Sequence, residues 1–166
     1  DKVAIALNDR QIKANHYLST PAPLSTMLWR ILIMSGDQYY EGYVSIFDSA
    51  SDVSLDAYHS SDYLLDNIQD EWGVQRLQWF TKGFYSVKQD EQNIVLSDLR
   101  MGVECSYVFN FFVGKQTNNG VVTGTFEKVS DRPDLSQLGS IWDRIWDASV
   151  SMVPDKKNGV CVTNEP

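Results

Sequence analysis

Apolar and polar residues follow one another in short blocks along this chain, and turn-forming residues separate the blocks. The clearest block is the apolar run MLWRILIM at residues 27–34, which has the length and β-branched content of a strand covered on both faces. After the turn SGDQ at residues 35–38, side chains alternate with the two-residue period of a second strand. We therefore predict a β-hairpin over Met27–Asp48.

Two further hairpins follow from the same signals. Strands over Phe84–Gln89 and Asn93–Leu99 flank the polar turn DEQN, and strands over Ser106–Lys115 and Val121–Lys128 flank Asn119–Gly120. Strands joined by such short turns pair antiparallel. The pattern thus predicts about six strands in a mostly antiparallel sheet.

Helical periodicity predicts three or four helices. The N-terminal one places Val3, Ala6 and Leu7 on one side and ends before Asn15. The others are a short helix capped by Ser61 or Asp62 and running through Gln69, one over about Glu71–Phe80, and the clearest, over Leu138–Asp147 after Pro133.

Two of these helices carry large apolar side chains. Together Trp72, Leu77, Trp79 and Phe80 offer more large apolar surface than an isolated helix needs, so we expect this region to pack on the sheet. In the last helix, one set of side chains recurs at helical spacing: Leu138, Ile141, Trp142, Ile145 and Trp146. The polar residues Asp143, Arg144 and Asp147 take the opposite side.

The remaining segments lack a regular pattern. Two prolines predict an extended stretch over Ser19–Leu24, and the Ser- and Asp-rich residues Ser49–Asp62 predict a loop. The sequence therefore predicts an α+β fold in a single soluble domain over residues 1–150, with hairpins packed against three or four helices. A loose polar tail over residues 151–166 follows.

Composition narrows the functional classes. The chain has 166 residues, 43% of them hydrophobic, which suffices for one core, and a net charge of −8. Such a charge argues against nucleic acid and anionic lipid as partners. No apolar run reaches the roughly 18 residues of a membrane span, and no signal sequence opens the chain. Because Asp1 comes first rather than Met, we expect an excised domain or a processed product.

The two cysteines, Cys105 and Cys161, form neither a disulfide framework nor the paired spacing of a zinc site. We expect one buried thiol and one thiol in the tail, with a bridge between them as the alternative. This spacing neither requires nor excludes an oxidising compartment.

Candidate chemistry is limited to a few charged side chains. Arg30 lies inside the apolar run 27–34, so its guanidinium must reach a carboxylate, a carbonyl or the sheet margin. It is therefore either a structural ion-pair partner or a ligand clamp. Asp98 and Arg100 are two residues apart on a strand, so they share a face and form either an ion pair or an anion clamp.

Other candidates are weaker. His59 with Asp56 and Asp62 offers donors for a divalent metal but too few ligands alone, and His16 fits a cap or surface position. A possible aromatic pocket would use side chains that are equally typical of ordinary strand packing: Tyr39, Tyr40, Glu41, Trp79 and Tyr85.

Several ordered blocks carry a resemblance to a known family. They are PAPLSTMLWR from Pro21, the DQYYEGY arm, WFTKGFY at Trp79–Tyr85 and SDLRMG at Ser97–Gly102, within about Pro21–Val113. In these blocks the chain resembles the segment that follows the transmembrane part of the YdjM-like membrane-bound metal-dependent hydrolases of bacterial inner membranes. Beyond Ser130 the resemblance ends.

The resemblance implies a location and an architecture. In that family the metal-binding histidines and acids belong to a membrane-embedded N-terminal half, which this chain does not contain, so no catalytic residue is carried over. It implies attachment to the bacterial inner membrane, with this part facing cytoplasm or periplasm. The parent's own transmembrane region is the implied partner, a homo-oligomer is possible, and any divalent metal belongs to the parent.

Three function classes follow. In the first, the chain is an accessory domain without metal or cofactor of its own, and no nucleic acid binds it. In the second, it holds an anionic-ligand or catalytic site built from Arg30, Glu41, Asp98 and Arg100. The third, a free-standing ligand-binding module, requires an apolar cavity.

Overall fold

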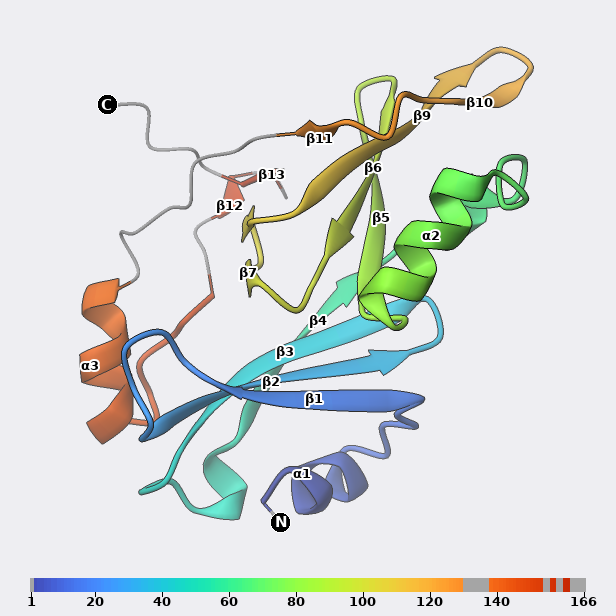
Figure 1. The fold of residues 1–166 in the computed structure, drawn as a ribbon. Helices are drawn as coiled ribbons and strands as arrows, with labels where there is room; N and C mark the ends of the chain where they lie inside the picture. The colour runs from blue at the N-terminus through green and yellow to red at the C-terminus, as the bar shows by residue number, and fades with distance from the viewer. Residues whose placement is uncertain (1, 130–137, 154–155, 158–159, 162–166) are drawn as a thin grey trace. The chain divides into compact units, whose positions relative to one another are not determined.

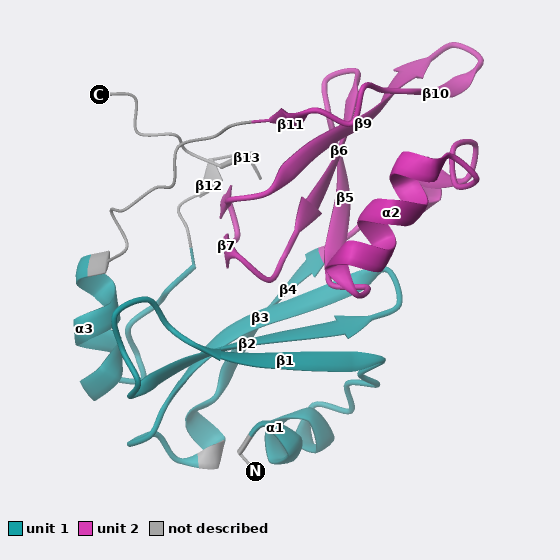
Figure 2. Ribbon diagram, in the orientation of Figure 1, with its two compact units in different colours: residues 1–58, 134–166 teal, residues 59–133 magenta. Residues whose placement is uncertain are grey.

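The computed structural model describes residues 2–129, 138–153, 156–157 and 160–161. They form an α+β fold of antiparallel hairpins and helices, as predicted (Figure 1). The chain divides into two compact units, residues 1–58 with 134–166 and residues 59–133 (Figure 2). A compact unit need not be a domain that folds alone, so the single domain over residues 1–150 stays a prediction.

The sheet of the first unit contains four strands in the order β1-β2-β3-β4. These are β1 (His16–Pro21), β2 (Leu28–Ser35), β3 (Gln38–Ser45) and β4 (Ser54–His59). The predicted hairpin is β2 and β3, and its turn is possible because Gly36 adopts φ +61°. As expected for a strand covered on both faces, most of β2 is buried.

The two edge strands correct the sequence analysis. Residues 49–62 are not a continuous loop, because they contain a 3₁₀ turn, η1 (Ala50–Asp52), and strand β4. Residues 19–24 are extended only to Pro21 and then turn, with Leu24 at φ +59°. Both strands lie at sheet edges and are rich in polar residues, so neither carries the apolar pattern of a central strand.

One face of this sheet packs against helix α1 (Lys2–Asp9), the predicted N-terminal helix. The core between them is formed by small and β-branched side chains: Val3, Ala6, Ile31, Ile33, Val44 and Val53. Within this sheet, strand β3 approaches its neighbour β4 closely at Gly42, where an added Cβ would meet the Ser54 carbonyl oxygen at 2.1 Å.

Helix α3 (Leu138–Trp146) is present as predicted, but it is rotated relative to the expected orientation. Ile141 and Ile145 are buried, and so is Arg144, whereas Trp142 and Trp146 are 58% and 68% exposed. The predicted buried face was therefore wrong for the two tryptophans, and the side chain of Leu138 lies outside the described residues. The tail is not wholly loose, because β12 (Lys156–Lys157) pairs antiparallel with β13 (Val160–Cys161).

The second unit contains a sheet of β10-β9-β6-β5, and β11 also pairs with β9. Its strands are β5 (Tyr85–Asp90), β6 (Asn93–Asp98), β9 (Asn110–Thr117), β10 (Gly120–Thr123) and β11 (Lys128–Val129). Both predicted hairpins are confirmed here. Both arms of the second are shorter than expected: Ser106–Tyr107 forms strand β8 and pairs with β7 (Gly102–Val103), and β10 ends at Thr123.

Helix α2 (Trp72–Thr81) packs on this sheet, as expected for this region, but it does so through small residues rather than through its largest side chains. Gly73 and Val74 are buried and Leu77 is partly buried, whereas Trp72 and Trp79 are exposed. Phe80 is 46% exposed, so of the four large side chains only Leu77 packs as predicted.

The predicted helix through Gln69 is a single 3₁₀ turn, η2 (Asp62–Leu65), followed by turns. Its apolar side chains Leu64, Leu65 and Ile68 are nevertheless buried in the core of this unit, as the pattern indicated.

Candidate functional site

Arg30 and Glu41 form a buried ion pair on the sheet of the first unit. Arg30 on β2 donates from Nε to Glu41 Oε1 on β3 at 2.6 Å, and both side chains are almost fully buried. The registered partner of Arg30 is Tyr43, so the pair runs diagonally across two neighbouring strands. The carboxylate predicted for this arginine is thus supplied within the same hairpin.

Tyr43 completes a small cluster with these two residues. Burial, and then the nearby Glu41 carboxylate, raise the pKa of Tyr43 well above its ordinary value. The Arg30 charge and its hydrogen bond to the tyrosine oppose that rise with a smaller effect. The phenol is therefore held in its neutral form, in which it both donates and accepts hydrogen bonds.

Asp98 and Arg100 form a second pair, in the second unit. Arg100 Nη2 lies 2.6 Å from Asp98 Oδ2, Arg100 Nε lies 2.9 Å from Oδ1, and the Arg100 backbone N–H also donates to Oδ1. These hydrogen bonds raise the pKa of Arg100, and its guanidinium stands 4.9 Å from the ring centre of Phe80. The predicted ion pair is confirmed, but Arg100 lies in the turn after β6 and not on the strand as expected.

The four predicted site residues therefore occur as two pairs, each complete within its own unit. In each pair a guanidinium binds a buried carboxylate at 2.6 Å, which is the geometry of a charge-assisted bond. A common site formed by all four stays a prediction.

The residues of the possible aromatic pocket lie on different faces of β3 and in both units. Tyr39 and Glu41 point to one face of β3, while Tyr40 points to the other, because neighbouring residues of a strand alternate. Tyr39 is fully buried and stacks on Tyr58 at 5.4 Å between ring centres. In the second unit, Trp79 is exposed on α2 and Tyr85 accepts a hydrogen bond from Gln78.

The histidine candidates do not gather metal ligands. His59 is exposed and Asp56 lies three residues before it on β4, which places the two on opposite faces of the strand. Burial raises the pKa of Asp56, and Asp62 accepts a hydrogen bond from Ser60. Within the described residues no three metal-ligating side chains come together. His16 is half-buried at the start of β1.

A third buried ion pair was missed by the sequence analysis. Arg144 of α3 donates to both carboxylate oxygens of Asp48, at 3.1 and 2.7 Å, and to the Tyr43 carbonyl oxygen at 2.8 Å. Asp48 also accepts a bond from the backbone N–H of Ser45, whose hydroxyl donates to the Ile145 carbonyl. No local pattern indicates this pair, because its members are 96 residues apart.

Two further features of the second unit differ from what was expected. Glu104 is buried and accepts bonds from Lys88 at 2.6 Å and from the Tyr107 hydroxyl at 3.3 Å. Cys105 is disulfide-bonded rather than a free buried thiol, which corrects the expected state of this cysteine. The sequence contains one other cysteine, Cys161, whose side chain lies outside the described residues.

A hollow of about 210 Å³ lies on the sheet of the first unit, near the start of α1. Its lining is mostly apolar and comes from α1, β1, β2, β3 and the residue after β3: Val3, Ser19, Trp29, Ile31, Val44, Ser45 and Ile46. None of the four predicted site residues lines it.

No helix within the described residues combines the length and the apolar character needed to cross a membrane. Comparison of the chain with protein-family models, with curated proteins and with solved structures gave no match.

Proposed function

We propose that this chain is a soluble accessory domain of a membrane-bound metal-dependent hydrolase, with the metal chemistry located in an N-terminal membrane part of the same protein. The proposed class of the parent protein rests on the resemblance of the blocks within Pro21–Val113 to YdjM-like proteins. The accessory role rests on a single observation, the pairing of the charged side chains that a ligand site would need.

That pairing extends beyond the predicted residues. Arg30, Arg100 and Arg144 each bind a buried carboxylate within hydrogen-bonding distance, and Lys88 does the same with Glu104. A guanidinium held by a carboxylate in this way has little free charge to offer an anionic ligand. Removing either partner leaves a buried charge behind, so such pairs favour a structural role.

The disulfide of Cys105 bears on which side of the membrane this domain faces. Disulfides persist in the bacterial periplasm and are rare in the cytosol, where thiols are kept reduced. We infer that this domain belongs to the inner membrane and faces the periplasm, with the parent's own transmembrane region as its partner.

Metal analysis tests the division of labour. The parent protein, extended upstream of Asp1 and purified in detergent without chelator, is expected to contain stoichiometric divalent metal, and this chain alone is not. Structural metal sites need three or four converging ligands. Stoichiometric zinc or manganese in the isolated chain, or an upstream reading frame without apolar spans, would contradict the proposal.

Reporter fusions test the orientation. Alkaline phosphatase fused after this domain in the parent should be active, because that enzyme requires disulfides that form outside the cytoplasm. A green fluorescent protein exported through the same pathway should stay dark at that position. The opposite pattern would place the domain in the cytoplasm and overturn the inferred side.

A further inference from the structure

The hollow near α1 exists because the helix is too short for the sheet. Eight residues of α1 span about 12 Å, whereas the eight residues of β2 span about 26 Å. Helix α1 covers Ile31 and Ile33, and the next row of the same face stays open. Trp29 and Ile46 are consequently 37% and 53% exposed.

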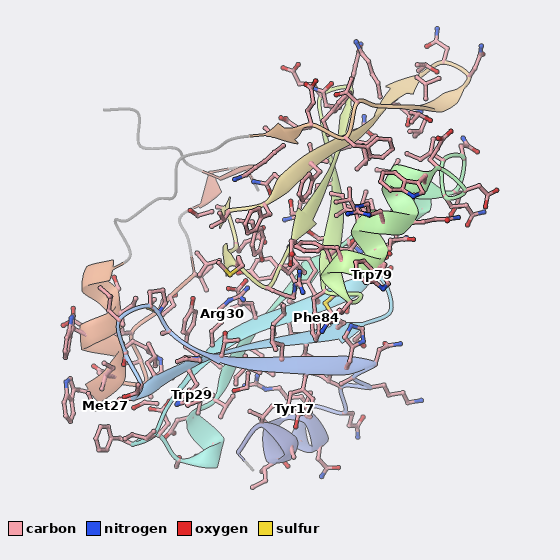
Figure 3. All side chains as sticks on the ribbon, in the orientation of Figure 1. Tyr17, Met27, Trp29, Arg30, Trp79 and Phe84 are labelled. Carbon is pink, nitrogen blue, oxygen red and sulfur yellow. The ribbon has the colours of Figure 1, made fainter. Side chains whose placement is uncertain are left out.

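This open row lies on the face opposite the buried ion pair. Trp29 and Arg30 are neighbours on β2 and point to opposite sides of the sheet (Figure 3). No residue that lines the hollow carries an ionised side chain. Its chemistry is therefore independent of the Arg30–Glu41 pair.

The size of the hollow restricts what it holds. An apolar cavity of about 150 Å³ stays dry and takes one benzene ring, whereas pockets for drug-sized ligands and cofactors occupy roughly 300–1,000 Å³. At about 210 Å³, this hollow fits one ring with a small substituent. The indole of Trp29 supplies an aromatic face against which such a ring can stack.

The polar groups at the hollow leave one side chain for a ligand. Ser45 follows Val44 on β3, so its side chain points to the opposite face, where its hydroxyl donates to the Ile145 carbonyl at 2.7 Å. The Trp29 indole N–H donates to the Thr26 carbonyl at 3.1 Å. Ser19, exposed on β1, is the remaining hydroxyl among the lining residues, all of which are described. A hydroxyl both donates and accepts, so it matches a phenol or a similar neutral group.

We propose that this hollow binds a single neutral aromatic ring bearing one small polar substituent, of the chemical class of a simple phenol. An aromatic carboxylate is disfavoured because the hollow offers no cation and the chain carries a net charge of −8. The site is a property of the first unit and stands apart from the accessory role proposed above.

The test is a titration of the chain with p-cresol, followed at the indole N–H signal of Trp29 by NMR and by the thermal midpoint. Saturable movement of that signal and a rise of the midpoint are expected, since a ligand that binds the folded state stabilises it. 4-Methylbenzoate, which has nearly the same shape but is ionised, should move the signal far less. Absence of a saturable shift with p-cresol up to its solubility limit would overturn the proposal.

Three variants locate the site. Ser19→Trp fills the hollow from an exposed strand position and should weaken p-cresol binding at least about tenfold, the factor that corresponds to about 1.4 kcal/mol. Tyr17→Trp makes a comparable change two residues away on the same strand, outside the hollow, and should bind like wild type. Ile46→Glu places a charge at the exposed rim and serves if Ser19→Trp fails to fold. Unchanged binding in the folded Ser19→Trp or Ile46→Glu protein would refute the site.

Discussion

Removing the Asp48 carboxylate should destabilise the first unit strongly. In wild type, Arg144 is only 2% exposed and makes two bonds to Asp48 and one to the Tyr43 carbonyl. In the Asp48→Ala protein, the guanidinium would keep the carbonyl but lose the opposing charge. Breaking a buried pair in this way costs about 3–5 kcal/mol, because the remaining charge is left without compensation.

The expected change in melting temperature follows from the size of the chain. For proteins of this length, 1 kcal/mol corresponds to roughly 2–4 °C, so Asp48→Ala should melt about 6–20 °C below wild type. Circular dichroism at 222 nm with heating measures the difference. Asp143→Ala is the matched control, since it removes an exposed carboxylate from the same helix and should shift the midpoint by less than about 2 °C.

A double variant separates the buried charge from the loss of packing. Asp48→Leu with Arg144→Met removes both charges while keeping apolar bulk, and such replacements are often neutral or stabilising. We expect this protein to recover most of the lost stability. A midpoint for Asp48→Ala equal to that of Asp143→Ala would refute the argument that the pair fixes α3.

Three further predictions concern single residues. Asp98→Ala should lower the thermal midpoint, because the partly buried Arg100 loses its partner at about 1–3 kcal/mol, and an unchanged midpoint would favour a ligand role for the pair. Folding raises the pKa of Tyr43, so the neutral phenol contributes its full share to the free energy of unfolding below about pH 10. That contribution is lost as the pH rises above this value. Chemical unfolding between pH 8 and 11.5 should therefore show a smaller alkaline loss for Tyr43→Phe than for wild type, and equal losses would contradict the raised pKa. Gly42→Ala should lower the free energy of unfolding by about 1–3 kcal/mol, because the added Cβ would strike the Ser54 backbone. Gly139→Ala is the control, since nothing lies within 4 Å of its added Cβ. Equal free energies of unfolding for the two variants would contradict the close approach of β3 and β4 at Gly42.

The sequence by itself determined the elements that local chemistry specifies. The apolar run at residues 27–34 and the turn at Gly36 were sufficient for the central hairpin. The charges and close spacing of Asp98 and Arg100 were sufficient for their ion pair, because the contact is local. The expected strand geometry was wrong, since β6 ends at Asp98 and Arg100 lies in the turn that follows. The α+β class followed from the hairpins together with the helical periodicity.

Tertiary structure decided which face of each helix is buried. The spacing of Trp142 and Trp146 fits an inward apolar stripe. Which side chains are buried, however, depends on the segments that the helix packs against. Here Arg144 pairs with Asp48, 96 residues away, while Trp142 and Trp146 stay exposed and Trp146 stacks on Phe47. No local pattern encodes a partner at that separation.

The edge strand β4 and the hollow depended on the tertiary structure for related reasons. Residues 54–59 are polar, and their pattern predicted a loop. They nevertheless form β4 and pair with β3, where Gly42 lets the two backbones approach closely. The hollow arises from a mismatch in length between α1 and β2, which becomes visible only when the helix lies on the sheet. Local propensity depends on neighbouring residues. The pairing of β4 with β3 and the packing of α1 on β2 depend instead on segments that only the folded chain brings together.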